Sequence, residues 1–378
     1  MARKRRPLRF KIFVLIFMCL MVVGGMKVVE LVQNFFGDHV LDFQKMATIQ
    51  YEKDKDLIVQ PFKKEMIVYN KNKLKVFNLE GIEKWSLEKD VKSPLVKTSE
   101  NLIYLVDREV GTITAINIQG NILWDLSLEK PIRDLVCNKE GRIVLYSEEK
   151  DKRSIHILNK EGKETGKVIV NNGNIMGIAI AENGMIAVSV MNVDKNKIET
   201  NVALYSSGGK LLGGHKYDQE EQIVSNLFFS QDQRLMNVGD SQLMVFSKED
   251  RVVWEKKLAD AMHRIAWNEQ GFLIMHLVDN KKSILDTKNR NYISIVDMEK
   301  TEVDPIPIQG EIRGITTKGD HIIAFTDRTL YIISKKGKEV MEKKINNDIQ
   351  AVYIISEDQL SLVLKDKIEI MQIKYKEQ

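Results

Sequence analysis

Five aspartates stand at one place in a repeated pattern, each directly after an apolar segment: Asp107, Asp240, Asp279, Asp327 and Asp366. A hard cation such as Ca²⁺ needs several anionic oxygens, and separate segments can supply them. Asp107, Asp279 and Asp327 are therefore the candidate metal ligands, and a metal there would support a hydrolase. The alternative is that each Asp starts a hairpin by accepting backbone N–H groups, a role in which Asn can replace it. We favour the hairpin interpretation.

Other side chains with chemical potential do not form a site in the sequence. The six histidines, which are His39, His156, His215, His263, His276 and His321, are too far apart for the two-to-four-residue spacing of a metal-binding pair. We expect them to be ordinary strand or loop histidines. The Gly208–Gly209 and Gly213–Gly214 pairs lack the lysine and the strand-to-helix context of a phosphate-binding loop, which predicts turn glycines. No cofactor is expected.

The elements that would position these residues are repeats of one short segment, found seven times between Leu74 and Ile345. Each repeat ends at a turn residue, and these turn residues are Gly81, Gly120, Gly162, Gly209, Asp250, Lys300 and Gly337. The positions seven, five and four residues before the turn are apolar in every repeat. Adjacent strand residues point to opposite faces, so the pattern predicts a strand that is covered on both sides. The position six before the turn varies freely.

A small polar residue always lies three positions before the turn, as Asn78 and Asn117 do. Such a side chain can hydrogen-bond the following backbone, and Gly tolerates the positive φ that closes the turn. The segment is therefore predicted to be the hairpin between the third and fourth strands of a sheet. Trp85, Trp124 and Trp254 follow the turn by four residues, where each ring is expected to cover the seam to the next sheet.

The spacing between turns, 37 to 50 residues, suits four short strands and is typical of propeller blades. After Gly337 the chain supplies only three further strands, and one strand over residues 40–51 precedes the first full blade. We expect this strand to complete the last blade and close the ring, which leaves no free sheet edge there. The prediction is an all-β, eight-bladed β-propeller, with seven blades as the alternative.

The amino terminus combines six basic residues before position 12 with an uncharged run from Ile12 to Met26. A basic flank stays in the cytoplasm and places the following domain outside. We expect residues 1–11 to be a cytoplasmic flank, 12–29 a transmembrane signal anchor, 30–39 a hinge and 40–378 an extracytoplasmic propeller. A cleaved signal peptide is the alternative, although no A-x-A-like cleavage pattern is present.

The remaining composition argues for one nearly neutral domain. Six of the 57 basic residues lie before residue 12, which leaves 51 against 53 acidic residues. The basic pI therefore reflects the flank, and no nucleic-acid partner is expected. Cys137 is the single cysteine of the large domain, so an internal disulfide is excluded there.

The repeats resemble those of the PQQ-like propeller superfamily over residues 40–378. The resemblance is strongest at Ala115, Asn117, Gly120 and Trp124, which stand where that repeat has Ala, Asp, Gly and Trp. With its basic anchor, the whole chain resembles a family of membrane-anchored PQQ-like propellers of clostridia and related Firmicutes. That resemblance implies a ring facing the cell wall but no known activity, and the fold alone does not decide function.

Two functional hypotheses follow. One is a non-enzymatic binding or assembly platform, tethered to the membrane, for a protein, peptide or cell-envelope ligand at the propeller rim. The other is an extracytoplasmic metal-dependent hydrolase or lactonase with its ligands in the channel, comparable to the calcium-dependent lactonase propellers. We favour the platform, because it explains the tether without requiring motifs that the sequence lacks.

Overall fold

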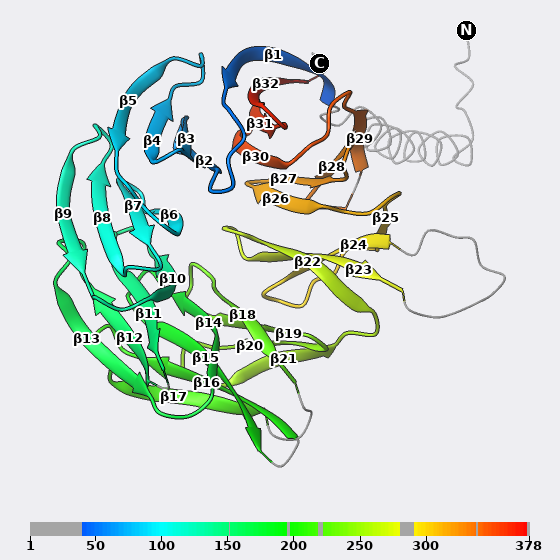
Figure 1. Ribbon diagram of the computed structural model, residues 1–378. Helices are drawn as coiled ribbons and strands as arrows, with labels where there is room; N and C mark the ends of the chain where they lie inside the picture. The colour runs from blue at the N-terminus through cyan, green and yellow to red at the C-terminus, as the bar shows by residue number, and fades with distance from the viewer. Residues whose placement is uncertain are drawn as a thin grey trace, which may run out of the picture. The chain divides into compact units, whose positions relative to one another are not determined.

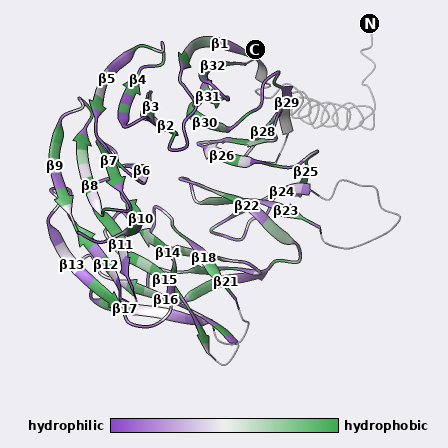
Figure 2. Cartoon of the chain, in the orientation of Figure 1, coloured by the Kyte–Doolittle hydropathy of each residue, from purple (hydrophilic) through white to green (hydrophobic). Residues whose placement is uncertain are grey.

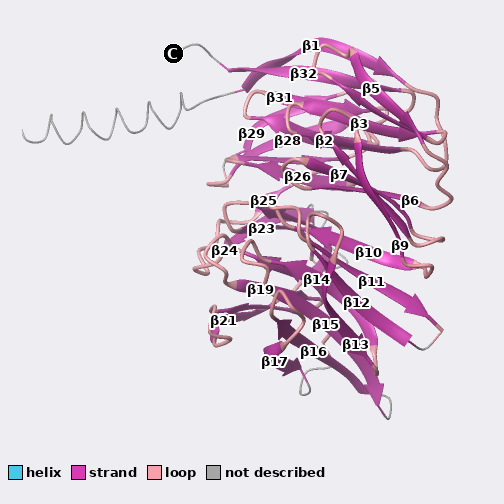
Figure 3. Ribbon diagram, turned by 90° about the vertical axis from the view of Figure 1, so that its left-hand side faces the viewer, coloured by secondary structure: helices cyan, strands magenta, loops and turns pink. Residues whose placement is uncertain are grey.

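A computed structural model describes residues 40–150, 152–194, 197–217, 222–279, 291–337 and 339–375. Contacts divide the chain into two compact units, Phe43–Ile373 on the one hand and Met1–Asp42 with Lys374–Gln378 on the other. The expected cytoplasmic flank, anchor and hinge lie outside the described residues. Every regular element of the described residues is a strand (Figure 3), and these residues include no helix long and apolar enough to cross a membrane.

Four-stranded antiparallel sheets follow one another along the chain as blades. Blades 1 to 4 contain β2 (Ile58–Phe62), β3 (Glu65–Asn70), β4 (Lys73–Phe77) and β5 (Glu83–Glu88); β6 (Pro94–Thr98), β7 (Leu102–Asp107), β8 (Thr112–Asn117) and β9 (Ile122–Ser127); β10 (Ile132–Cys137), β11 (Ile143–Glu149), β12 (Lys152–Leu158) and β13 (Glu164–Val170); β14 (Asn174–Ile180), β15 (Ile186–Asp194), β16 (Lys197–Tyr205) and β17 (Leu211–Tyr217).

Blades 5 to 7 continue the pattern, and blade 8 joins the two ends of the described chain (Figure 1). Blade 5 contains β18 (Val224–Phe229), β19 (Leu235–Gly239), β20 (Gln242–Phe246) and β21 (Val252–Lys257), and blade 6 contains β22 (Ala261–Asn268), β23 (Phe272–Val278), β24 (Asn291–Asp297) and β25 (Ile306–Pro307). Blade 7 contains β26 (Gly314–Lys318), β27 (His321–Phe325), β28 (Thr329–Ser334) and β29 (Glu339–Lys344). Blade 8 contains β30 (Ala351–Ser356), β31 (Gln359–Val363), β32 (Lys367–Tyr375) and β1 (Val40–Gln50).

Ring closure by the amino-terminal strand is confirmed. The strand order of the last sheet is β1-β32-β31-β30, so β1 supplies its fourth, outer strand. The Tyr51 N–H donates to the Asp366 carbonyl at 3.0 Å, and the Tyr51 hydroxyl donates to the Leu364 carbonyl. The fold is therefore an all-β, eight-bladed propeller, and the seven-bladed alternative is wrong.

The antiparallel order gives each blade two ends. We call the end that carries the hairpins between first and second strands, and between third and fourth strands, the lower face. The upper face carries the hairpins between second and third strands and the connections between blades. The predicted turns thus all lie on the lower face, whereas the five aspartates lie on the upper face.

The core lies in the seams between blades, because the middle strands are apolar on both sides. In β3, Ile67 and Tyr69 pack into the seam with blade 2, whereas Met66 and Val68 pack into the seam with blade 8. In Figure 2 hydrophobic colour follows the strands, and the loops are mainly hydrophilic. Of the apolar positions predicted from the repeat, all are buried except Phe77 and Tyr205, which are partly buried.

The position that varies freely between repeats is buried more often than its variety suggests. Thr114, His156, Met244, Ser294 and Tyr331 occupy it and are all buried. Polar members find local partners there: the Thr114 hydroxyl donates to Asp125 at 2.5 Å, and His156 contacts Glu164 at 2.6 Å and Ser147 at 3.2 Å. Neighbouring side chains thus supply hydrogen-bond partners for the buried Thr114 and His156.

The predicted third-to-fourth-strand turns form as expected. The Asn78 side-chain oxygen accepts the Ile82 N–H at 2.8 Å, and Asn117 accepts the N–H groups of Gln119 and Asn121 at 3.0 and 2.9 Å. A positive φ occurs at all seven turn residues, including the two that are not glycine, Asp250 and Lys300. Gly213 and Gly214 instead lie within β17, so the prediction of a turn at this second pair is wrong.

Candidate functional site: a pocketed surface on the lower face

The predicted tryptophans lie in seams on the lower face and join neighbouring blades. The Trp85 indole N–H on β5 donates to the Ile118 carbonyl of the next blade's turn at 3.0 Å. The Trp124 indole N–H on β9 donates to the Lys160 carbonyl at 2.9 Å. The Trp254 indole N–H on β21 donates to the Met298 carbonyl at 2.8 Å. The neighbouring blade thus satisfies the one hydrogen-bond donor of each ring.

Two of these three rings remain partly open to solvent. Gly120 and Gly162 pack closely against Trp85 and Trp124, so closely that a Cβ would lie 2.6 and 2.7 Å from the respective ring. At the third seam the turn residue is Lys300, whose ammonium lies 6.0 Å from the centre of the Trp254 ring. Trp254 is buried, whereas Trp85 and Trp124 line pockets.

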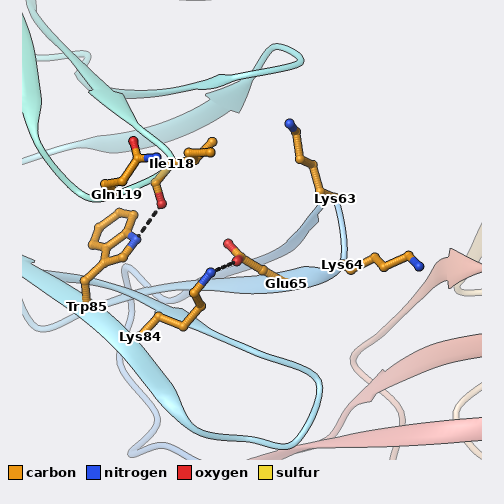
Figure 4. A pocket seen from close by; sticks show the side chains of 7 residues that line it. All are labelled: Lys63, Lys64, Glu65, Lys84, Trp85, Ile118 and Gln119. Atoms are coloured by element: carbon orange, nitrogen blue, oxygen red, sulfur yellow. Dashed lines mark hydrogen bonds and ion pairs between the residues drawn. The ribbon is translucent and has the colours of Figure 1, made fainter.

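Trp85 forms one wall of a pocket of ≈ 550 Å³ between blades 1 and 2 (Figure 4). Its other residues are Lys63, Lys64, Glu65, Lys84, Ile118 and Gln119. Lys84 pairs with Glu65 across the pocket, whereas the Lys63 and Lys64 side chains extend away from that pair. The pocket therefore combines an aromatic edge, an apolar contact and charges of both signs.

An equivalent pocket of ≈ 510 Å³ lies one blade further on, between blades 2 and 3. Trp124 takes the place of Trp85, and the turn residues Lys160 and Glu161 take the place of Ile118 and Gln119. Leu123 lies in this pocket and is 53% exposed, a high value for a large apolar side chain. The repeat thus produces the same kind of cavity twice.

A third pocket of ≈ 570 Å³ connects the other two at the inner ends of blades 1 to 4. It shares Lys63 with the first pocket and Ser99, Glu100 and Lys139 with the second. Together the three form one continuous area, which we call the lower surface: residues 61–65, 84–85, 98–102, 118–119, 123–124, 137–140, 160–161, 180 and 182.

The charges of the lower surface balance. Its basic residues are Lys63, Lys64, Lys84, Lys139 and Lys160, and its acidic residues are Glu65, Glu100, Glu140, Glu161 and Glu182. Burial raises the pKa of the Cys137 thiol to about 11, so this group stays protonated at neutral pH and is a poor nucleophile. The lower surface thus presents apolar edges beside equal numbers of positive and negative side chains.

Asp107 lies at the end of β7, and its carboxylate is occupied by the backbone. One oxygen accepts the Lys92 N–H at 2.9 Å, and the other accepts the Glu109 and Val110 N–H groups at 3.0 and 3.2 Å. The side chain is only 4% exposed. These contacts are those of a hairpin-starting aspartate, the interpretation that we favoured.

The other candidate carboxylates lie on different blades of the upper face. Asp327 on blade 7 is exposed and pairs with Arg313 at 2.7 Å, at the edge of a pocket of ≈ 1070 Å³. Asp240 on blade 5 accepts the Ile223 N–H at 3.2 Å. Asp279 follows β23 on blade 6. On blade 8, burial and the nearby Asp366 carboxylate together raise the pKa of Tyr51 to about 12. The structure thus places the candidate ligands Asp107, Asp279 and Asp327 on three separate blades.

Within the ranges that the structure describes, no three His, Cys, Asp or Glu side chains gather closely enough to hold a metal ion. His276 is buried on β23 and contacts the Asn291 side-chain oxygen at 3.2 Å, and burial lowers its pKa. The rings of His276 and His263 lie 5.6 Å apart. This neighbouring pair was not predicted, because a strand bulge between Met262 and Arg264 brings the two histidines together.

The tryptophans of the repeat predicted contacts at the seams between blades, but no feature of the sequence predicted the lower surface. Its lysines and glutamates come from four blades, mostly from short hairpins, where the sequence shows only ordinary solvated loop residues. A usable signal was the recurrence of Trp with a glycine in the next turn, which occurs at two adjacent seams. The two tryptophan pockets join through the third because hairpins between first and second strands of different blades meet in the folded ring. The sequence alone does not show where these hairpins meet.

Solved structures with the same fold include propellers of varied function. BamB from Moraxella catarrhalis is 12% identical with a TM-score of 0.58, over 88% of this chain and 100% of that one. The Dos1 propeller is 10% identical with a TM-score of 0.62, over 90% and 98%. A catalytically inactive virginiamycin B lyase from Staphylococcus aureus, solved with quinupristin, is 14% identical with a TM-score of 0.52, over 84% and 100%.

At these identities the likeness shows the β-propeller fold alone. A comparison with curated proteins finds no match. The sequence itself matches one family over residues 40–373, which is nearly the whole propeller, and the chain therefore belongs to the Family of unknown function (DUF5711).

Proposed function

We propose that this protein is a membrane-tethered, extracytoplasmic binding platform that takes up a protein, peptide or cell-envelope component on its lower surface. The observation that carries the proposal is the merging of three pockets into one area across blades 1 to 4. Two tryptophans border this area, and tryptophan is among the residues that contribute most energy to protein interfaces.

The polar character of the area supports reversible binding. Lys160 and Glu161 are 66% and 52% exposed, so a partner can reach them without rearrangement of the blade. A rigid sheet scaffold holds the short hairpins in place, which limits the entropy that binding must overcome. The metal-dependent hydrolase remains an alternative without a supporting contact, since the Asp107 carboxylate already serves the backbone.

Lysine labelling with a membrane-impermeant acetylating reagent tests the proposal on intact cells. Lys84 and Lys160 report on the lower surface, and Lys55 and Lys92, which are 84% and 63% exposed on the upper face, are the matched controls. We expect Lys55 and Lys92 to react equally in cells and in the purified chain. Lys84 and Lys160 should react severalfold more slowly in cells, as measured by mass spectrometry.

The two parts of the proposal fail differently in this experiment. If no propeller lysine reacts until the cells are lysed, the extracytoplasmic placement is wrong. If all four lysines react as fast in cells as in the purified protein, the lower surface has no partner and the platform is wrong.

A further inference from the structure

We infer that the lower surface docks an extracytoplasmic segment of a second protein embedded in the membrane that carries the anchor. This inference rests on the proposed function and adds to it an orientation and a class of partner. Its evidence is the direction in which the chain enters and leaves the propeller, together with the charge of the lower surface.

Both ends of the propeller chain lie on the lower face. The Met46 sulfur in β1 accepts a hydrogen bond from Gln359 at 3.7 Å, and Gln359 begins β31 at the lower hairpin of blade 8, so the residues of β1 that precede Met46 lie at this end of the blade. The Ile373 N–H, late in β32, donates to the Asp358 carbonyl of the same hairpin at 2.7 Å. The chain therefore enters β1 on the lower face and runs upward to Tyr51.

A short tether connects this entry point to the proposed anchor. Residues 30–39 separate the apolar run from β1, and ten residues of extended chain span at most about 33–36 Å. This reach is comparable with the thickness of the hydrocarbon core of a bilayer, about 30 Å. Because the tether joins the propeller on the lower face, we infer that this face, with the lower surface on it, lies nearer the membrane on average than the upper face does.

A protein segment fits the lower surface better than lipid headgroups do. Attraction to anionic lipids requires an excess of Lys and Arg, each contributing about 1 kcal/mol near the surface. The lower surface has equal numbers of lysines and glutamates, so this attraction cancels. Pockets of ≈ 510 to 570 Å³, bordered by indole edges and the exposed Leu123, suit side chains of a protein instead.

Energy transfer in the reconstituted full-length chain tests the orientation. One dye is attached at Gln119→Cys on the lower face and, in a second variant, at Val110→Cys on the upper face of the same blade; both positions are exposed. Strand β8 separates them by about 20 Å. Cys19 and Cys137 are both replaced by Ser, because Cys137 lines the third pocket and is a second site at which the dye could attach. The acceptor is a headgroup-labelled lipid.

We expect transfer from position 119 to be roughly twofold more efficient than from position 110, given that separation. Equal or reversed efficiencies overturn the orientation, even if the lysine labelling supports a platform. A photoreactive residue at the same two positions in cells then tests the partner class. Adducts at 119, but not at 110, with peptides of an integral membrane protein support the inference. Adducts with a phospholipid or a soluble secreted protein, or no adduct, overturn it.

Discussion

The aspartates of the upper face illustrate how one residue type can serve different purposes at one place in a repeat. At Asp107 both carboxylate oxygens accept backbone N–H groups of the loop that enters blade 2 and of its own hairpin. At Asp327 the carboxylate is exposed and pairs with the Arg313 guanidinium. From the sequence alone, Asn appears equally suitable at both places, because an Asx turn needs only one acceptor oxygen.

The contacts now predict different outcomes for the same substitution. Asp107→Asn places an NH₂ group opposite either the Lys92 N–H or the hairpin N–H groups, which leaves buried donors unpaired and costs about 1–3 kcal/mol of stability. Asp327→Asn breaks an exposed ion pair, for which little change is expected. Thermal unfolding with and without EDTA measures both effects. A bound metal that the Asp107 variant loses would contradict the hairpin role and favour the hydrolase.

At the scale of elements, the turns between third and fourth strands pack against the outer strand of the preceding blade, and different residues make this contact at different seams. Trp85 and Trp124 place a ring against Gly120 and Gly162. Gly166 replaces the ring at the next seam, where the backbone of Gly208 approaches so closely that a side chain on Gly166 would meet it at 2.5 Å. A missing ring is thus compensated by a closer approach of the backbones.

The substitution Gly162→Ala tests this packing. A Cβ at Gly162 would lie 2.7 Å from the Trp124 ring, at a φ of +77°. We expect a loss of about 2–4 kcal/mol, from overpacking together with the unfavourable φ. Gly319→Ala is the matched control: its φ is also positive, +54°, but nothing lies within 4 Å of the new Cβ. Equal losses of unfolding free energy in urea would show that the ring contact contributes nothing.

Much of the element structure was predictable because it depends on local chemistry. The apolar pairs identify strands covered on both sides, and a small polar residue followed by a positive-φ position specifies each turn. Blade 6 departs most from the pattern: Asp304 and Pro305 interrupt its outer strand, and β25 retains only two residues. The pairing of Gly166 with the Gly208 backbone was not predictable, since it depends on how closely two blades approach.

At the scale of the whole molecule, the number of blades was predictable and the site was not. Counting strands gave a remainder of three at one end and one at the other, and a sheet with a free edge is unfavourable. The lower surface instead depends on hairpins of several blades that are far apart in sequence. No repeat pattern marks Lys63, Gln119 or Glu182 as neighbours of one area.

Closure of the ring predicts the largest effect of any truncation. A chain that begins at residue 54 lacks β1, so Ile49 leaves the cluster with Val59 and Met66, and the Gly81 turn loses its contact with Thr48. Each large apolar side chain removed from the core costs about 1.5–3 kcal/mol, and the backbone of β32 is left as an unpaired edge that promotes aggregation. We expect this chain to unfold at a much lower temperature than a chain that begins at residue 36.

A peptide of residues 36–53 offers the matched control. If β1 acts as the closing strand, adding the peptide to the shortened chain restores part of the lost stability, because the peptide can pair with β32 in the same register. The melting temperature should then rise with peptide concentration, as mass action requires for a ligand of the native state. A scrambled peptide should have no effect. Equal melting temperatures for the two chains would show that blade 8 holds without its fourth strand, and that the ring does not depend on its closure.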